Sequence, residues 1–258
     1  MSEINASAVA SLRSRTGVSI LECKKALEET NGDEEKAIEI LRKKGSAQAA
    51  KKAERTQSEG SIFMHQEDGK AAIVFLRCET DFVARDDFFI SLGTNLVNTL
   101  CKEGEDAAKA SAETGVPAAV QKLGENITVG DMRLVSGVLL GTYLHSNSKI
   151  GVIIGLEGGT EEMARDVAMH AAAMNPEYVS PEDVSAELIE SEKAIWTEQL
   201  SNEGKPEEIM GKIMIGKEKK FREESALITQ SFVKEPDKTV QQYLDGATVS
   251  EYARIAVS

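Results

Sequence analysis

The sequence has few aromatic residues and no long apolar segment. Aromatic side chains make up 5% of the 258 residues, with a single tryptophan, although 41% of the residues are hydrophobic. This aliphatic composition predicts several modest cores that are packed largely by helices. No stretch reaches the roughly 18 apolar residues that a membrane span needs, and residues 1–5 lack a basic region followed by an apolar run. We therefore expect a protein that is neither secreted nor inserted in a membrane.

Cysteine is also scarce, and its spacing excludes two kinds of site. The three cysteines are Cys23, Cys78 and Cys101. An odd number without a CxxC pair favours neither a disulfide framework nor a structural zinc site, and it fits a reducing cytoplasm. The three histidines are far apart and match no HExxH or Cys/His metal spacing. We expect a cytoplasmic protein without a bound metal or cofactor.

Positive charge and phosphate-binding motifs are lacking as well. The chain has 30 Lys and Arg against 43 Asp and Glu, and its net charge of -13 repels nucleic-acid phosphates. The sequence contains neither a GxxxxGK[ST] loop nor the dinucleotide motif GxGxxG. Cys78 lies in a predicted strand without a nearby histidine signal, so we expect an inert core thiol rather than a nucleophile. These absences argue against a nucleic-acid partner, a bound nucleotide and enzymatic chemistry.

Helix signals are strong in the N-terminal part of the chain. Three helices are predicted, over residues 6–15, 19–30 and 33–44. Ser19 and Glu22 are expected to form a capping box, and Gly45 is expected to end the third helix. Residues 46–60 lack large apolar side chains and are expected to form a linker or a solvated helix. We place a domain boundary near residue 54.

A hairpin followed by a helix is predicted after this boundary. Strands over residues 61–65 and 71–78 are joined by the turn signal Glu67-Asp68-Gly69. The helix that follows carries an apolar stripe at spacings of three or four residues, formed by Phe89, Leu92, Leu96 and Leu100. This stripe is expected to cover one face of the hairpin.

The rest of the chain repeats this pattern and adds a helical hairpin. The second unit has predicted strands over residues 132–144 and 149–156 and a predicted helix over residues 160–174. The helical hairpin is predicted over residues 181–224, with four apolar side chains inward: Ile209, Met210, Ile213 and Met214. The region near Trp196 is open to two interpretations, helix packing or a dimer face. A helix over residues 237–244 and a strand over residues 249–257 follow, and the strand is expected to join the second sheet.

Thr80-Asp81-Phe82-Val83 lies between the second strand and a helix that is expected to start near Ala84. Connections of this kind are exposed. One interpretation is that Thr80 or Asp81 caps the helix and Phe82 staples it to the core. The other is that an aromatic ring beside an acid anchors the chain in a pocket of a partner. Position and spacing leave both interpretations open.

Two of the histidines lie in contrasting places. His145 is in the turn between two predicted strands, where a packing role and a functional role are equally open. His170 lies among alanines on a predicted helix, where we expect a packed or surface histidine.

Two stretches of the sequence carry a family resemblance. The N-terminal stretch is Leu12-Arg13-x-x-Thr16-Gly17, followed by Cys23-Lys24-Lys25-Ala26-Leu27 and Asn31-Gly32-Asp33. The second is Cys78-Glu79-Thr80-Asp81-Phe82-Val83-Ala84-Arg85. Weaker matches are Gly124-Glu125-Asn126-Ile127, Tyr143-x-His145, Ile150-Gly151-Val152, Met169-His170-Ala171-Ala172 and Pro181-Glu182-Asp183-Val184. In this order they resemble the translation elongation factor Ts family, the nucleotide exchange factors of the GTPase elongation factor Tu.

The resemblance implies an α+β architecture with a two-subdomain core of antiparallel strands and packed helices. Its parts are a ubiquitin-associated-like three-helix module (1–54), a core N-subdomain (55–140), the first part of a core C-subdomain (141–180), an inserted helical hairpin (181–228) and the closing part of the C-subdomain (229–258). Many members continue with a further helical segment, so contacts of that segment are expected to be missing or replaced. Arg77 stands where the family is expected to have Asn, which puts the local strand pairing in doubt.

The resemblance also implies a partner and its contacts. The chain is expected to bind elongation factor Tu, both GDP-bound and nucleotide-free, and to promote GDP release without covalent chemistry. Dislocation of the partner's magnesium is implied for Thr80, Asp81, Phe82 and Val83. Secondary partner contacts are implied for Arg13, Thr16, Gly17 and His145. Some members dimerise through the hairpin, here residues 181–228.

Two rival functions remain. A ubiquitin-associated-like adaptor would dock partners without changing the rate of nucleotide release. A small enzyme would need convergent polar residues around a pocket, which this sequence does not show. The rate of GDP release from the partner distinguishes an exchange factor from both.

Overall fold

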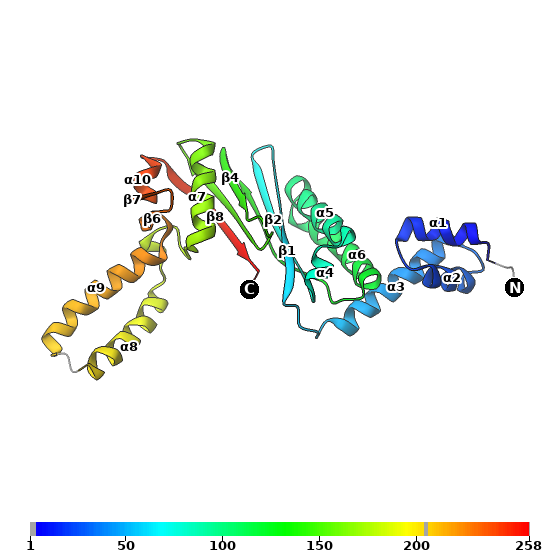
Figure 1. Ribbon diagram of the computed structural model, residues 1–258, viewed down its shortest axis with the longest axis horizontal. Helices are drawn as coiled ribbons and strands as arrows, with labels where there is room; N and C mark the ends of the chain where they lie inside the picture. The colour runs from blue at the N-terminus through cyan, green and yellow to red at the C-terminus, as the bar shows by residue number, and fades with distance from the viewer. Residues whose placement is uncertain (1–3, 204–205, 258) are drawn as a thin grey trace. The chain divides into compact units, whose positions relative to one another are not determined.

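Helices and antiparallel strands make up the protein, so the α+β class is confirmed. The computed structural model describes residues 4–203 and 206–257 (Figure 1). Contacts divide the chain into two compact units: unit 1, which is Met1–Val135, Leu144–Gly151 and Ile255–Ser258, and unit 2, which is Ser136–Tyr143 and Val152–Arg254. The finer five-part division stays a prediction. Residues 1–3, 204–205 and 258 lie outside the described residues. They include part of the N-terminal stretch for which no targeting signal is expected and part of the predicted helical hairpin.

The three N-terminal helices begin at capping side chains. They are α1 (Ala6–Thr16), α2 (Ile20–Glu29) and α3 (Glu34–Lys52). The side chains of Asn5, Ser19 and Asp33 accept hydrogen bonds from free backbone N–H groups of the first turns, as helix caps do. The buried side chains include Leu12, Cys23, Ala26, Leu27, Ala37 and Leu41. The three predicted helices are therefore present, each with its own cap and one shared core.

Gly45 does not end the third helix. It is buried inside α3, where a Cβ atom would lie 3.0 Å from the carbonyl oxygen of Pro117 on α6 (Glu105–Leu123). A glycine at this point lets two helix backbones approach closely. The prediction of a helix end was wrong because close tertiary packing and helix termination both select glycine. Helix α6 was not predicted; its sequence contains Gly115 and Pro117, which both disfavour a helix interior.

Strands β1 and β2 form the predicted hairpin. The strands are β1 (Glu59–Glu67) and β2 (Lys70–Cys78), antiparallel and paired from Glu67 opposite Lys70 to Glu59 opposite Cys78. Asp68 and Gly69 have φ angles of 49° and 69°. Positive φ at both central residues is the geometry that matches the twist of a two-residue hairpin. Strand β3 (Thr128–Ser136) lies beside β2 and completes a three-stranded sheet.

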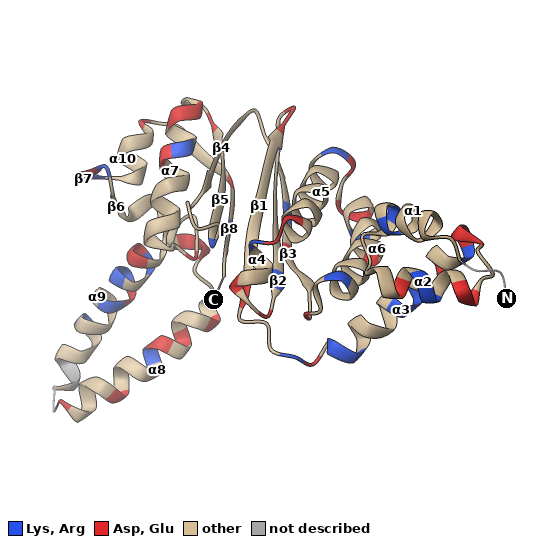
Figure 2. Ribbon diagram, turned by 45° about the vertical axis from the view of Figure 1, so that its right-hand side comes forward, with Lys and Arg blue, Asp and Glu red and all other residues tan. Residues whose placement is uncertain are grey.

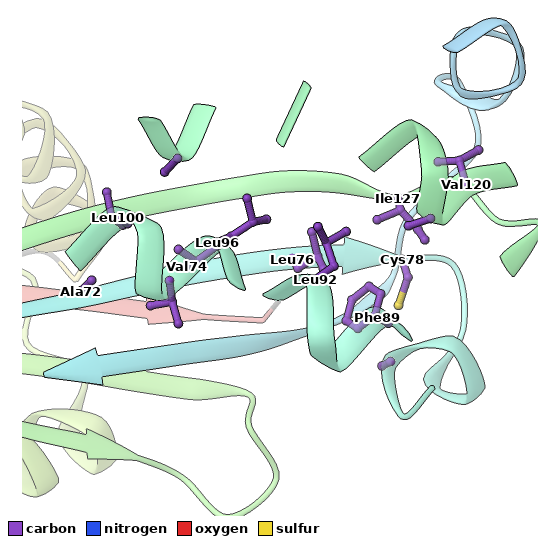
Figure 3. Close-up of a cluster of buried hydrophobic side chains, with 14 of the residues drawn as sticks. Ala72, Val74, Leu76, Cys78, Phe89, Leu92, Leu96, Leu100, Val120 and Ile127 are labelled. Carbon is purple, nitrogen blue, oxygen red and sulfur yellow. The ribbon is translucent and has the colours of Figure 1, made fainter. Parts of the chain in front are cut away.

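Helix α5 (Asp87–Glu103) packs on this sheet through the predicted apolar stripe. Figure 3 shows Phe89, Leu92, Leu96 and Leu100 of α5 facing side chains of β2. Gly93 lies on the same helix, and a Cβ atom there would lie 2.1 Å from the ring of Phe63 on β1. The ring of Phe63 therefore occupies the space that a side chain at position 93 would need. Its centroid lies 6.2 Å from that of the Phe89 ring.

A second three-stranded sheet has the order β4-β5-β8. Its strands are β4 (Leu139–Leu144), β5 (Ile150–Glu157) and β8 (Thr248–Ala256), so the last strand joins the second sheet as predicted. The single strand predicted over residues 132–144 was wrong, because the chain breaks at Gly137 and Val138 and its first half, β3, pairs with β2. Helix α7 (Glu161–Met174) packs on β4 so closely that a Cβ atom at Gly141 would lie 2.1 Å from the Ala164 carbonyl carbon.

Two longer helices follow, the first with mostly acidic charged side chains and the second with charges of both signs (Figure 2). They are α8 (Ala186–Asn202) and α9 (Glu207–Ser225), and residues Pro181–Asp183 form a 3-10 turn before Ser185 caps α8. The rings of Trp196 and Phe221 meet edge to face at 5.7 Å, so Trp196 takes part in helix packing. The inward placement predicted on α9 was wrong for Ile209 and is confirmed only in part for Met210, Ile213 and Met214. Ile209 is 49% exposed and the other three are half-buried, because two paired helices cannot cover both of their faces.

His170 lies in a buried polar cluster under a small hairpin that was not predicted. The hairpin consists of β6 (Ser231–Phe232) and β7 (Glu235–Thr239), and α10 (Val240–Leu244) follows it. The N–H of Val233 donates to His170 Nδ1 at 3.3 Å, so the ring proton is on Nε2, 3.0 Å from Gln230 Oε1. Asp166, one turn earlier on α7, accepts from Lys234 and from the Tyr243 hydroxyl. His170 is therefore a packed histidine, and burial lowers its pKa.

We predict that the free energy of unfolding falls below about pH 6.5 because of His170. A lowered pKa in the folded state means that the unfolded chain takes up the proton first, at the ordinary histidine pKa of about 6.5. Stability from this group is present above that pH and is lost as the pH falls, by at most about 1.4 kcal/mol per pH unit. Urea unfolding at several pH values should show a smaller slope for His170→Asn. Equal slopes for wild type and His170→Asn would contradict the assignment.

Candidate functional site

Helix α4 (Asp81–Ala84) is a single turn between β2 and α5. Thr80 caps it, because the Thr80 hydroxyl oxygen accepts from the Val83 N–H at 3.4 Å. The continuous helix predicted from near Ala84 was wrong. The chain breaks after Arg85, where the Asp86 side chain accepts from the Phe88 N–H at 2.8 Å and so begins α5 as a separate helix.

The side chains of α4 point to opposite sides. Ala84 is buried and Val83 is half-buried against the core of unit 1, whereas the Phe82 side chain is 82% exposed. The interpretation of Phe82 as a staple to the core is therefore wrong, although the cap by Thr80 is present. An aromatic ring fully in water on a capped turn gains apolar burial only from another molecule. This geometry suits a contact residue.

Asp81 and Arg85 add charges beside the exposed ring. Their side chains form an ion pair at 3.0 Å across one helical turn, and both are substantially exposed. Exposed pairs of this kind contribute little to stability. The carboxylate of Asp81 is therefore free to exchange Arg85 for a cation or a hydrogen-bond donor of a partner.

Asp81, Ala84 and Arg85 also line a groove of about 770 Å³. The β4–β5 turn, residues 146–149, which belongs to unit 1, lines the same groove. Lys149 holds this turn in place, because its ammonium group pairs with Glu59 and donates to the Gly60 carbonyl oxygen at 2.8 Å. The groove is therefore lined by segments that are far apart in the sequence, including β1 and α5.

His145 lies at the start of that turn. Its N–H donates to the Ile150 carbonyl oxygen at 2.9 Å, its own carbonyl oxygen accepts from the Ser148 N–H at 2.8 Å, and its side chain is exposed. His145 is not a wall residue of the groove itself. The structure thus brings the turn of His145 to the groove beside Asp81, which sequence spacing could not show.

The other candidate residues lie at the end of α1. Gly17 ends this helix with φ 68°, and its N–H donates to the Arg13 carbonyl oxygen at 2.7 Å. Arg13 and Gly17 line a separate hollow of about 720 Å³ together with Lys24 of α2 and Lys122 of α6. The Thr16 hydroxyl donates inward to the Leu12 carbonyl oxygen, so Thr16 supports the local structure rather than presenting a side chain. The candidates therefore lie in two separate places in unit 1, around α4 and at the end of α1.

Cys78 lies just before α4, and its thiol is unsuited to nucleophilic chemistry. The side chain is buried, and its sulfur lies 3.2 Å from the Thr80 carbonyl oxygen. Burial, together with the negative charge of Glu125, raises the pKa of the thiol to about 12. The described residues also contain no group of acidic, cysteine and histidine side chains placed to hold a metal ion. Among the described helices, none is long and apolar enough to cross a membrane.

Comparison with known proteins decides the family. Residues 79–258 match the family described as Elongation factor TS. Elongation factor Ts of Aeromonas hydrophila subsp. hydrophila is 44% identical over 269 residues, covering 100% of this chain and 92% of that protein. Its counterpart in Marinobacter nauticus is 46% identical over 253 residues, covering 96% and 88%. The chain belongs to the elongation factor Ts family.

Elongation factor Ts proteins are translation factors that exchange the nucleotide of elongation factor Tu. Proteins of this family are generally not catalysts of covalent chemistry. The family match begins at Glu79, directly before α4, and the full-length relatives extend the likeness through the N-terminal helices.

Glu125 is a residue whose role sequence reasoning missed. Its carboxylate accepts hydrogen bonds from Glu79 and Thr80, which are 46 and 45 positions earlier. The sequence offered only the family string Gly124-Glu125-Asn126-Ile127, since no local periodicity connects Glu125 with α4. The contact depends on the tertiary structure alone.

We predict that the Cys78 thiol is protected from alkylation in the folded protein. Raising the pKa from about 9 to about 12 lowers the thiolate fraction near pH 8 about a thousandfold. Iodoacetamide should therefore modify Cys78 slowly in the native Cys23→Ala/Cys101→Ala variant and rapidly in urea. Equal rates in the two conditions would show that Cys78 is not held as a neutral buried thiol.

Proposed function

We propose that this chain binds elongation factor Tu with GDP, disturbs its magnesium and phosphate site, and promotes GDP release so that GTP can rebind. The observation that carries this proposal is the exposure of Phe82 on a capped helical turn. Phe82 would enter a pocket of the partner, with the carboxylate of Asp81 beside it. Thr80 and Val83 would hold the turn, because Thr80 caps it and Val83 packs inward.

The mechanism needs no covalent step. A GTPase holds GDP through a backbone cradle around the phosphates and through Mg²⁺, which requires near-octahedral ligands at about 2.1 Å. A rigid turn that shifts either one weakens nucleotide binding steeply. The coupling is reciprocal, so a thousandfold loss of nucleotide affinity, about 4 kcal/mol, lowers the affinity of the factor equally when GTP rebinds.

Secondary contacts would come from the two other places in unit 1. Arg13 and Gly17 would meet the nucleotide-binding domain of the partner through the N-terminal module, whose ubiquitin-associated-like character is part of the proposal. Thr16 would support Gly17 from inside. His145 would contact the partner from the turn beside the Asp81 groove.

The helical hairpin of residues 181–228 is proposed as a homodimer contact. The described part of α8 and α9 exposes three large apolar side chains, Ile195, Ile209 and Ile215, of which Ile215 is 72% exposed. A second copy of the chain could bury them. Trp196 is not available for this contact, because it packs on Phe221.

We predict that Phe82→Ala slows exchange without harming the fold. The ring is exposed, so the free energy of unfolding should stay within about 0.5 kcal/mol of wild type. A buried aromatic anchor contributes about 2 kcal/mol or more to an interface, so release of labelled GDP from elongation factor Tu should slow about thirtyfold. The matched control is Val138→Ala, whose side chain is 94% exposed, and it should exchange normally.

The outcomes of this experiment separate the rival functions. An adaptor would bind elongation factor Tu without accelerating GDP release in any variant. Normal exchange by Phe82→Ala would place the active surface away from α4, even though the family is established.

We predict that Ile215→Lys lowers the mass measured by light scattering if wild type is a dimer. The charged side chain would have to lose its water at a buried contact, which is strongly unfavourable. Gly216→Lys, at the next position of α9, tests whether an added charge by itself dissociates the dimer. A wild-type monomer at concentrations well above micromolar would rule out this contact.

A further inference from the structure

Glu125 binds the segment directly before α4 through three hydrogen bonds. Its Oε2 atom accepts from the N–H groups of Glu79 and Thr80, both at 3.0 Å. Its Oε1 atom accepts from the Thr80 hydroxyl at 2.6 Å. Both oxygens of one half-buried carboxylate are thus directed at the two residues that lead into the exposed turn.

The loop that carries Glu125 is itself held firmly. Asn126 is 2% exposed, and its backbone N–H donates to Glu79 Oε1 at 2.6 Å. The Glu79 segment therefore both donates to this loop and accepts from it. The Asn126 side-chain amide donates to the carbonyl oxygens of Ala53 and Arg55, just after α3. The Lys52 ammonium group donates to the Gly124 carbonyl oxygen. Glu125 is therefore a fixed point rather than a mobile surface acid.

Helix α4 has little to hold it otherwise. It contains four residues, its single cap bond is 3.4 Å long, and the ion pair along its surface is exposed. One helical turn is not stable in water without tertiary support. Val83 and Ala84 supply apolar contact on the inner side, but apolar contact is not directional. The hydrogen bonds of Glu125 are directional and charge-assisted, so they can determine the orientation of the turn.

We propose that Glu125 is a positioning residue for exchange: it fixes the orientation of α4, and so presents Phe82, without contacting the partner. This inference rests on the proposed function of α4. It assigns a role to Glu125, which lies 43 positions after Phe82 in the sequence. That role depends on the hydrogen bonds of Glu125 to Glu79 and Thr80.

Glu125→Gln tests the role with minimal change of shape. A carboxylate only accepts hydrogen bonds, whereas an amide replaces one acceptor oxygen by an N–H₂ donor. The amide can keep its oxygen toward the two backbone N–H groups and direct its N–H₂ at the Thr80 hydroxyl, which then accepts instead of donating. It nevertheless loses the negative charge that strengthens all three hydrogen bonds. The substitution should therefore loosen the start of α4 while keeping the packing of Val83 and Ala84.

The experiment is a double-mutant cycle on GDP release from elongation factor Tu at saturating factor. We expect Glu125→Gln to slow release about tenfold or more in the wild-type background, and less than about twofold in the Phe82→Ala background. A merely structural role would slow release by the same factor in both backgrounds. Equal factors, or a normal rate for Glu125→Gln, would overturn the proposal.

Phe82→Ala also tests the proposed site at α4 separately from the positioning role of Glu125. If it slows release and Glu125→Gln does not, the positioning role alone fails; if it exchanges normally, the site and the positioning role both fail. Amide hydrogen exchange should be faster at Glu79 and Thr80 in Glu125→Gln and unchanged in unit 2. Should Glu125→Gln not unfold cooperatively, Glu125→Asp, which withdraws the carboxylate by one methylene, replaces it in the cycle.

A control variant removes a helix cap elsewhere. The Thr160 hydroxyl oxygen accepts from the Met163 N–H at 3.2 Å and caps α7 in unit 2. Thr160→Ala should lower stability by about 1 kcal/mol, as lost caps do, and leave GDP release unchanged. Loss of exchange in this control as well would assign the effect of Glu125→Gln to general stability and overturn the positioning role.

Discussion

The junction of Glu79, Glu125 and Asn126 is the constraint on which the candidate site depends. Each of the two acids accepts a backbone N–H from the segment of the other, so the loops before α4 and after α6 are joined in both directions. Hydrogen bonds to a half-buried carboxylate are strong and directional. They make a rigid support from two loops that would each be flexible alone, and the end of α3 is attached to the same support.

Rigidity at this point supports the role proposed for the exposed ring of Phe82. A flexible aromatic side chain on a loop would have to be ordered when it entered a partner, and the lost entropy would reduce the binding free energy. Helix α4 avoids part of this loss because Thr80 caps it, Val83 and Ala84 anchor it, and Glu125 orients it. In the proposed mechanism, this rigidity lets the turn displace the partner's magnesium or phosphate site, which a flexible loop could not do.

Unit 2 is stabilised differently. Its helix α7 carries two buried polar side chains, and each is satisfied by the segment that includes the β6–β7 hairpin and α10. Buried polar groups are tolerated only with such partners, so His170 and Asp166 specify where this small segment lies. The helices α8 and α9, by contrast, keep apolar side chains exposed and depend on each other through Trp196 and Phe221.

The sequence by itself determined what depends on neighbouring residues. The caps Ser19 and Asp33, the turn at Asp68 and Gly69 and the apolar stripe of α5 were predictable, because a side chain and the backbone a few residues away decide them. The tertiary structure decided the rest. Gly45 lies inside a helix because another backbone approaches it, and Phe82 is exposed because its neighbours Val83 and Ala84 face the core. Glu125 acts on α4 across 45 residues of sequence, and only the folded chain brings these groups within hydrogen-bonding distance.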